Sequence, residues 1–358
     1  MMGRGPLGPA GRRVRSRAAA ALVLASVAFP TRAGAAEETA QVRVGIARTI
    51  SDAGYYIADD KGLFRQEGIE VTIVPFKSAA QMIAPLGTGE LDVGGGTVSA
   101  GFYNAVGRGI GIKIVADQAS MKPGYGYSSL MVRKDLIDSG TYKTFADLKG
   151  RKVAIAAPGT GTASALNEVL KKAGLGYGDV EVVYLGFPEH LAAYRNKAID
   201  ASITNEPTMT RAIEEGVAVR VAGNDVTYPE QQTAVVFYAD DFIRNRRDVA
   251  QRFMRAYVRA VRIYNDALKD GRIAGPKADE VIPILLKNTP IKDEAMLRRI
   301  VPNAVDPNGR VNMVGLKNDL AFFRGLGLIE KKDIAVDGVV DDSFVKAAVA
   351  ELGPYRAK

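Results

Sequence analysis

The stretch IEVTIVPFKSAAQMIAPLGTGELDVGGG, residues 69–96, decides the expected fold, because a second stretch follows the same pattern. That second stretch is VEVVYLGFPEHLAAYRNKAIDASITNEP, residues 180–207. Both read as strand, turn, helix, turn and strand. Internal similarity is sought before a fold is chosen, and two copies are too few for a solenoid. The repeat predicts two similar lobes with a cleft between them. The alternative is that two generic strand–helix–strand units simply look alike.

The composition bounds the remaining possibilities. A chain of 358 residues exceeds a usual single core, so two domains are expected. The chain has no cysteine, which excludes disulfides, thiolate metal sites and a cysteine nucleophile. Its one histidine, His190, falls at the start of a predicted helix, and we take it for a surface residue. No metal and no cofactor are expected.

The first 35 residues read as a secretory signal peptide. A basic leader precedes a short apolar run at residues 18–29, and Ala33-Gly34-Ala35 supplies a small-residue cleavage site. An uncleaved anchor is the alternative, which the lack of a longer apolar segment disfavours. The pair Arg12-Arg13 hints at twin-arginine export, but its flanking residues fit poorly, so we expect the general route. No cysteine stands near the cleavage site, so the mature protein should be free of a lipid anchor in a periplasm.

The net charge argues against polyanionic partners. The formal charge is +8, and residues 1–35 carry six arginines and no acid, so +8 minus 6 leaves +2 for the rest. A nearly balanced protein gives no electrostatic case for nucleic acid or an anionic membrane as a partner.

Strands and helices alternate with short connections, which predicts an α/β protein with parallel sheets. A strand near residue 130 begins the second lobe, and a strand at residues 234–238 returns to the first. The expected division is residues 36–128 with 235–358 for lobe 1, and residues 129–234 for lobe 2. We expect the chain beyond residue 248 to be helical.

The binding loops should follow the strands. In open α/β sheets, ligands lie beyond the carboxyl ends of the strands, where helix N-termini point. Each such helix end stabilises an anionic group by about 0.3–1 kcal/mol. A single loop of this kind is more often an ordinary helix cap, but the convergence of several loops on one cleft favours ligand binding. The loops concerned are residues 51–55, 76–79, 95–99, 159–162 and 205–207.

Catalytic and cofactor motifs find little support. Residues 159–164, GTGTAS, nearly match G-x-G-x-x-G, but Ser164 stands at the third glycine and no acidic residue closes the following strand. No lysine follows the turn, so a phosphate loop is absent, and neither G-x-S-x-G nor H-E-x-x-H occurs. Asp92 and Asp200 occupy equivalent repeat positions, which favours a structural use over acid–base chemistry.

Several segments carry a family resemblance: AGYYIADDKGLFRQEGIEVTI, LGTGELDVGG, FADLKGRKVAI and NKAIDASITNEP. With these segments the chain resembles the solute-binding proteins of ABC importers in the nitrate/sulfonate/taurine and thiamine-precursor group. The resemblance implies a type II periplasmic binding protein fold. Two α/β lobes would be joined by two hinge strands, with the ligand cleft between them.

The resemblance also implies which residues would bind the ligand. Those of the first lobe would be Ser51, Asp52, Gly54, Tyr55, Lys77, Ser78, Gly96, Thr97 and Ser99. Those of the second would be Thr160, Gly161, Thr162, Asn205 and Glu206, with Tyr125 and Tyr127 near the hinge. One branch of the family makes a thiamine pyrimidine and carries a cysteine-rich iron motif. This chain has no cysteine, so we expect no catalytic residue and no enzyme.

The expected function is therefore solute capture. The protein would bind a small polar organic solute by hinge closure and deliver it, as a monomer, to an inner-membrane ABC permease. Lys77 and the helix ends favour a sulfonate or carboxylate. Tyrosines at positions 55, 56, 125, 127 and 228 would suit a heteroaromatic solute resembling a thiamine precursor. An enzyme on the same scaffold and a ligand sensor for a membrane receptor are the alternatives.

Overall fold

The computed structural model describes residues 39–357. The predicted signal peptide, residues 1–35, lies outside the described residues. Among the described residues, no helix combines the length and the apolar character that crossing a membrane requires.

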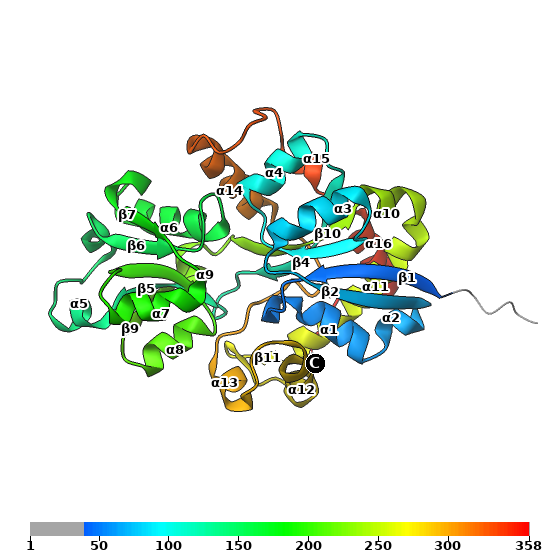
Figure 1. Cartoon of the computed structure of the whole chain (residues 1–358). Coiled ribbons are helices and arrows are strands. Elements are labelled where there is room, and N and C mark those ends of the chain that lie inside the picture. Colours follow the sequence, from blue (N-terminus) through cyan, green and yellow to red (C-terminus); the bar gives the residue numbers. More distant parts are fainter. Residues whose placement is uncertain (1–38, 358) are drawn as a thin grey trace, which may run out of the picture. The chain divides into compact units, whose positions relative to one another are not determined.

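Two five-stranded sheets organise the chain (Figure 1). The first has the strand order β2-β1-β3-β10-β4 and the second β7-β6-β8-β5-β9. The first sheet comprises β1 (Ala40–Ile46), β2 (Ile69–Pro75), β3 (Val93–Gly96), β4 (Ile112–Ser120) and β10 (Gln232–Ala239). The second comprises β5 (Ser128–Arg133), β6 (Lys152–Ile155), β7 (Glu181–Tyr184), β8 (Ala201–Asn205) and β9 (Ala218–Gly223).

The two sheets share one topology. Strands β1, β2, β3 and β4 occupy the positions that β6, β7, β8 and β9 occupy in the second sheet, and β10 corresponds to β5. The two similar sequence stretches therefore supply equivalent strands, β2 with β3 and β7 with β8. The repeat that the sequence suggested is a repeat of the fold.

The expectation of purely parallel sheets is wrong. Strand β10 runs antiparallel to both β3 and β4, and β5 runs antiparallel to β8 and β9. Each of these strands enters its sheet after the chain has crossed from the other sheet, so it arrives from the opposite end. The crossings fall between Ser120 and Ser128 and between Gly223 and Gln232. The exact division into domains stays a proposal.

Helices cover both sheets. Those next to the first sheet are α1 (Ala53–Asp60), α2 (Leu63–Gln66), α3 (Ile83–Thr88), α4 (Ala100–Gly107), α10 (Asp240–Asn245), α11 (Arg247–Asp266), α12 (Ala278–Asn288), α13 (Glu294–Arg299), α14 (Met313–Gly325), α15 (Val336–Val339) and α16 (Ser343–Leu352). Those next to the second are α5 (Lys134–Asp138), α6 (Gly161–Lys172), α7 (Phe187–Arg195), α8 (Thr208–Glu214) and α9 (Asn224–Thr227). Short 3-10 turns lie at Ile50–Asp52, Ala79–Met82, Phe145–Leu148 and Tyr177–Asp179.

Helix α11 anchors the larger core. Its apolar residues recur at the spacing of one helix face, and Phe253, Tyr257 and Val261 on that face are buried. Beyond α11 the chain is not wholly helical as expected, because β11 (Leu268–Lys269) and β12 (Arg272–Ile273) form a short hairpin. Asp270 and Gly271, both with positive φ, make the turn.

Candidate functional site

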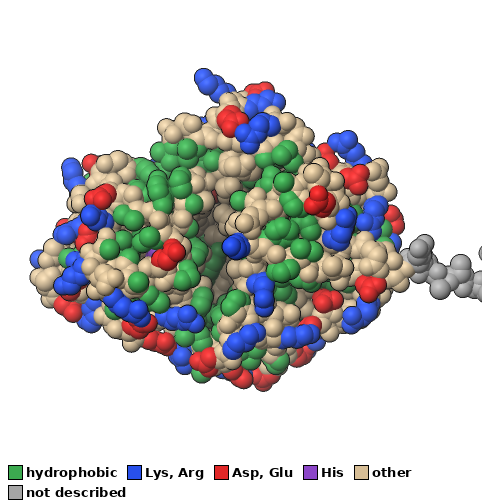
Figure 2. Space-filling view, in the orientation of Figure 1, with side chains coloured by type: hydrophobic (Ala, Val, Ile, Leu, Met, Phe, Trp, Pro, Cys, Tyr) green, Lys and Arg blue, Asp and Glu red, His purple; other side chains and the backbone are tan. Residues whose placement is uncertain are grey.

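A groove runs between the part of the molecule built on the second sheet and the part built on the first (Figure 2). Cationic side chains lie on the rim of the first part, and apolar side chains line both walls. The carboxyl ends of β1, β2 and β3 and of β6 and β8 carry the loops predicted to bind a solute.

The loop after β1 holds a buried carboxylate. Asp52 is 1% exposed, and its carboxylate accepts hydrogen bonds from the Thr49 backbone N–H at 2.8 Å and from Gln118 Nε2 at 2.8 Å. Burial raises the pKa of Asp52 to about 6, and these hydrogen bonds oppose the rise. Ser51 is half-buried, with its hydroxyl 2.7 Å from that of Thr49. Both oxygens of the Asp52 carboxylate therefore already accept hydrogen bonds from within the protein.

Gly54 and Tyr55 lie beneath this loop, inside the core. A Cβ on Gly54 would stand 2.5 Å from the ring of Tyr257, so the glycine permits close packing of α1 on α11. Tyr55 is fully buried and donates a hydrogen bond to the Gly94 carbonyl at 3.0 Å. As they stand, neither has side-chain surface open to a solute.

The loops after β2 and β3 meet each other. Lys77 and Ser78 are exposed, and a Cβ on Gly96 would lie 2.7 Å from the Cβ of Ala79. Gly96 has φ +142°, which only glycine adopts readily, so the close approach requires this residue. Thr97 is exposed, and Ser99 caps α4 by accepting from the Phe102 N–H at 3.3 Å.

The loop after β6 stands at the N-terminus of α6. The Thr160 hydroxyl donates to the Ala157 carbonyl at 2.8 Å and lies 3.0 Å from that of Thr162. Thr162 Oγ1 accepts from the Ala156 N–H at 3.1 Å. Both hydroxyls therefore stabilise the turn.

The loops of the two sheets touch. The Ala100 N–H at the start of α4 donates to the Gly159 carbonyl at 2.9 Å. Gln231 Nε2 donates to the Gly161 carbonyl at 2.7 Å, and Thr97 Cγ2 lies 3.9 Å from the position of a Cβ on Gly161. Two loops that the sequence analysis selected separately, 95–99 and 159–162, are thus brought together.

The end of β8 makes a second connection, to Val301 in the segment after α13. The Glu206 carboxylate accepts from the Thr210 N–H at 3.0 Å, the Thr210 hydroxyl at 2.9 Å and the Val301 N–H at 3.0 Å. Burial raises the pKa of Glu206. Asn205 Oδ1 is buried and has no hydrogen-bond partner among the described residues. Glu206 is engaged by the protein, whereas Asn205 keeps a free acceptor.

Most of the tyrosines proposed to stack on a solute are buried. Tyr55, Tyr56, Tyr125 and Tyr228 are between 0% and 8% exposed. Tyr127 is half-buried, and its carbonyl accepts from the Glu206 N–H at 2.9 Å. Of these five residues, Tyr127 is the most exposed.

The interpretation of His190 as a surface residue is wrong. Its side chain is fully buried, Nδ1 lies 2.7 Å from Thr204 Oγ1, and Nε2 donates to the Leu185 carbonyl at 3.2 Å. Burial lowers the pKa of His190 to about 4, so the ring is neutral at pH 7. The strand–helix–strand unit encloses it because α7 packs its inner face on β8.

Two functional candidates were missed by the sequence analysis. Arg48, exposed at the end of β1, has φ +58°, and such strain in a non-glycine residue often marks a ligand-contacting position. A cation directly after the first strand was the available signal. Gln231, buried between the sheets, had none, because its role depends on a contact with Gly161, 70 residues away.

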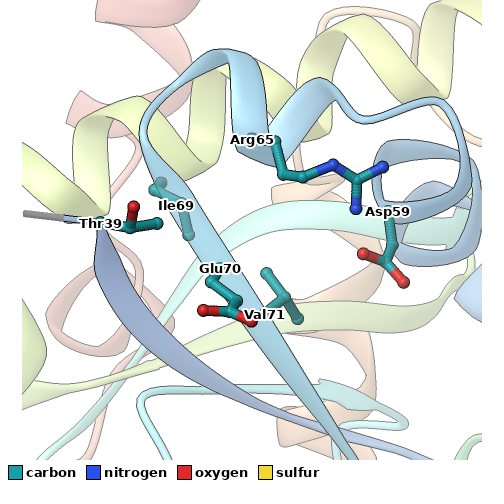
Figure 3. Close-up of a pocket in the computed structure, with 6 residues that line it drawn as sticks. All are labelled: Thr39, Asp59, Arg65, Ile69, Glu70 and Val71. Atoms are coloured by element: carbon teal, nitrogen blue, oxygen red, sulfur yellow. The ribbon is translucent and has the colours of Figure 1, made fainter.

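Two surface pockets lie elsewhere. One of about 370 Å³ borders the edge strand β2, and in Figure 3 Asp59 and Arg65 extend toward one another above Glu70 and Val71. The other, of about 510 Å³, lies between Ser120–Lys122 and residues 304–314. None of the predicted site residues lines either pocket. No group of three or more acidic or histidine side chains in residues 39–357 is placed to hold a metal ion.

Comparison with known proteins gives a family and a fold. A family model described as NMT1/THI5 like matches residues 50–268. A protein of Brucella abortus (strain 2308) named as a binding protein is 28% identical over 223 residues, which are 62% of this chain and 63% of that protein. A Brachyspira hyodysenteriae protein, named as an ABC transporter periplasmic binding protein, is 27% identical over 217 residues, 57% of this chain and 59% of the relative. The chain thus spans under two thirds of the length of these relatives.

Solved structures share the fold at low identity. The periplasmic aliphatic sulphonate binding protein SsuA of Escherichia coli gives a TM-score of 0.67 at 19% identity, covering 84% of this chain and 92% of that one. The periplasmic nitrate-binding protein NrtA of Synechocystis PCC 6803 gives 0.68 at 14%, covering 88% and 90%. The desulfurization enzyme DSZB gives 0.57 at 15%, covering 87% and 99%. The fold is the two-lobed periplasmic binding protein fold.

Proposed function

The chain belongs to the NMT1/THI5-like family, and from that premise we propose that it is the periplasmic solute-binding component of an ABC importer. It captures a small polar organic solute between its two lobes by hinge closure and delivers the solute to an inner-membrane permease. The names of the relatives that match its sequence support this class of function.

One contact carries the proposal. The Ala100 N–H at the N-terminus of α4 meets the Gly159 carbonyl just before α6, so loops from both sheets face each other across the groove. Both helices begin there, and helix N-termini attract anionic groups. A solute between these loops would touch both lobes at once. It would therefore bind the closed form better than the open form, as ligand-driven closure requires.

Free cations on the first lobe favour an anionic solute. Arg48 and Lys77 are exposed at the ends of the adjacent strands β1 and β2, and neither forms an ion pair within 4.0 Å with a described carboxylate. The nearby Asp52 is satisfied by Thr49 and Gln118. A sulfonate or carboxylate fits this charge pattern best. A heteroaromatic solute has less support, because most of the candidate tyrosines are buried.

The test is to identify what the protein carries. Native mass spectrometry after gentle purification should reveal a bound small molecule. The temperature of thermal unfolding should then rise when that molecule or an aliphatic sulfonate is added, since a ligand at 100 times its Kd stabilises the folded protein by about 2.7 kcal/mol. No carried molecule, together with no shift from sulfonates, carboxylates or nitrate, contradicts the proposal.

An enzyme on the same scaffold is the second candidate, because the fold is shared with the desulfurization enzyme DSZB. Incubation of the purified protein with a stoichiometric excess of the identified solute distinguishes a carrier from an enzyme. A carrier returns the solute unchanged, whereas an enzyme releases product beyond one equivalent.

A further inference from the structure

Asp319 is a buried carboxyl where helices of both lobes meet. It lies on α14 and is 1% exposed. Tyr228 lies in the segment that leads from the second sheet back to the first, and its Oη lies 2.7 Å from Asp319 Oδ1. Ser164 of α6 and Tyr103 of α4 also lie beside the carboxyl. The carboxyl therefore contacts parts of the protein that hinge motion would separate.

The hydrogen count at Tyr228 favours a neutral Asp319. The single hydroxyl hydrogen of Tyr228 faces two acceptors, Asp319 Oδ1 at 2.7 Å and the Gly315 carbonyl at 3.1 Å. If Asp319 is ionised, one hydrogen must serve both. If Asp319 carries a proton, its O–H donates to Tyr228 Oη and Tyr228 donates to Gly315, so both contacts are complete.

No cationic side chain in residues 39–357 forms an ion pair with Asp319. Burial raises the pKa of Asp319 to about 7, the negative charge of Glu168 on α6 adds to the rise, and the hydrogen bond from Tyr228 opposes it. Glu230, close to Tyr228, is a further negative charge on the return segment. Arg324 on α14 donates to the Ile334 carbonyl, and it forms no ion pair with Asp319 among the described residues. The Ser164 and Tyr103 hydroxyls lack a hydrogen-bond partner in the described chain.

We propose that Asp319 is a proton-operated latch between the lobes: its neutral carboxyl, bonded to Tyr228, holds α6 against α14, and loss of the proton loosens this contact. The latch rests on the hinge motion of the proposed function. Closing then takes up a proton, and solute capture is tighter in acid than in mild alkali.

In an open form Asp319 would meet water and have an ordinary pKa near 3.9, whereas in this structure, where loops of the two lobes are in contact, its pKa is about 7. Between these two pH values, closure takes up a proton. The stabilisation that this proton gives to the closed form therefore falls as the pH rises toward 7. Raising the pH from 5.5 to 8.5 should lower the closing equilibrium constant about tenfold or more.

The absence of cysteine makes the test direct, because two introduced cysteines can be spin-labelled without background. Ala80, after β2, and Ala192, on α7, are exposed and lie on opposite lobes. Label distances in the doubly substituted full chain, without solute, should lengthen between pH 5.5 and 8.5. Asp319→Asn should stay closed throughout, because its amide can donate to Tyr228. Asp333→Asn, an exposed control, should behave as the parent.

Two outcomes overturn the latch: distances in the parent that do not change with pH, or an Asp319→Asn variant with the parental pH profile. An Ala100→Leu variant distinguishes this from failure of hinge motion, because Ala100 faces Gly159 across the lobes. If Ala100→Leu separates the labels while pH does not, the latch is wrong and hinge motion stands. If neither separates the labels, the hinge closure of the proposed function fails. Circular dichroism melting confirms that each variant is folded.

Discussion

Asp92 and Asp200 make the same pair of backbone hydrogen bonds in the two sheets. Asp92 Oδ2 accepts from the Arg43 N–H at 2.8 Å, and the Asp92 N–H donates to the Arg43 carbonyl at 3.1 Å. Asp200 Oδ2 accepts from the Lys152 N–H at 3.0 Å, and the Asp200 N–H donates to the Lys152 carbonyl at 2.8 Å. Each aspartate thus ties the start of one strand to its neighbour, which confirms their structural interpretation.

This role makes Asp92 a stability determinant. Asp92→Ala should lower the free energy of unfolding by about 2–3 kcal/mol, because it leaves a backbone N–H and the Arg43 guanidinium without their acceptor. Urea unfolding measures the change. The exposed Asp333→Ala should change it by less than about 0.5 kcal/mol. A similarly small effect at Asp92 would contradict this role.

The contact between the lobes can be tested with a matched pair of glycines. Gly159 has φ +60° and Gly174 has φ +70°, so alanine should strain both turns by about 1 kcal/mol. A Cβ on Gly159 would also stand 2.9 Å from Ala100, whereas one on Gly174 would meet nothing within 4 Å. Calorimetric titration with the solute identified by mass spectrometry should show weaker binding for Gly159→Ala only. Equal affinities in the two variants would show that the contact does not matter for capture.

A substitution at Arg48 should change solute affinity and protein stability in opposite directions. Arg48→Gly removes the cation and relieves the left-handed conformation, so stability should rise by about 1 kcal/mol. Affinity for an aliphatic sulfonate should fall about tenfold or more, a loss of about 1.4 kcal/mol. Lys197→Gly is the control, since Lys197 has φ +56° and lies on the second lobe in an exposed turn. An Arg48→Gly variant that binds the sulfonate as well as the control does would remove Arg48 from the site.

His190 predicts an acid-dependent loss of stability. Its pKa of about 4 in the folded protein lies below the ordinary value of 6.5. The contribution of His190 to the free energy of unfolding is therefore complete above pH 6.5 and is lost as the pH falls through 4. The loss should reach roughly 3 kcal/mol. As the only histidine, it gives isolated ring signals in NMR, whose titration reads the pKa directly. A midpoint near 6.5 in the folded protein would contradict burial, and His190→Gln should lack this part of the pH dependence.

Much of the fold was predictable because it depends on local patterns. The repeated stretches give β2 with β3 and β7 with β8, and the apolar spacing around Phe253 and Tyr257 gives α11. The antiparallel β5 and β10 were not predictable in the same way. Their direction is set by the chain's crossing between the sheets, which strand propensity does not encode.

The site was predictable only as a set of loops. Loops 95–99 and 159–162 were selected because glycine and threonine follow strands, and they do come together. Burial of Tyr55 and His190 was missed because it depends on partners distant in sequence or on the opposite face of a helix. Asp319 and Tyr228 are 91 residues apart, so no pattern linked them.

Solution X-ray scattering with and without the solute tests capture between two lobes most directly. Hinge closure predicts a smaller radius of gyration when the solute is added at pH 8.5, where the contact of Asp319 is loosened, with the change saturating at one equivalent. A radius that stays the same while calorimetry records binding would contradict it.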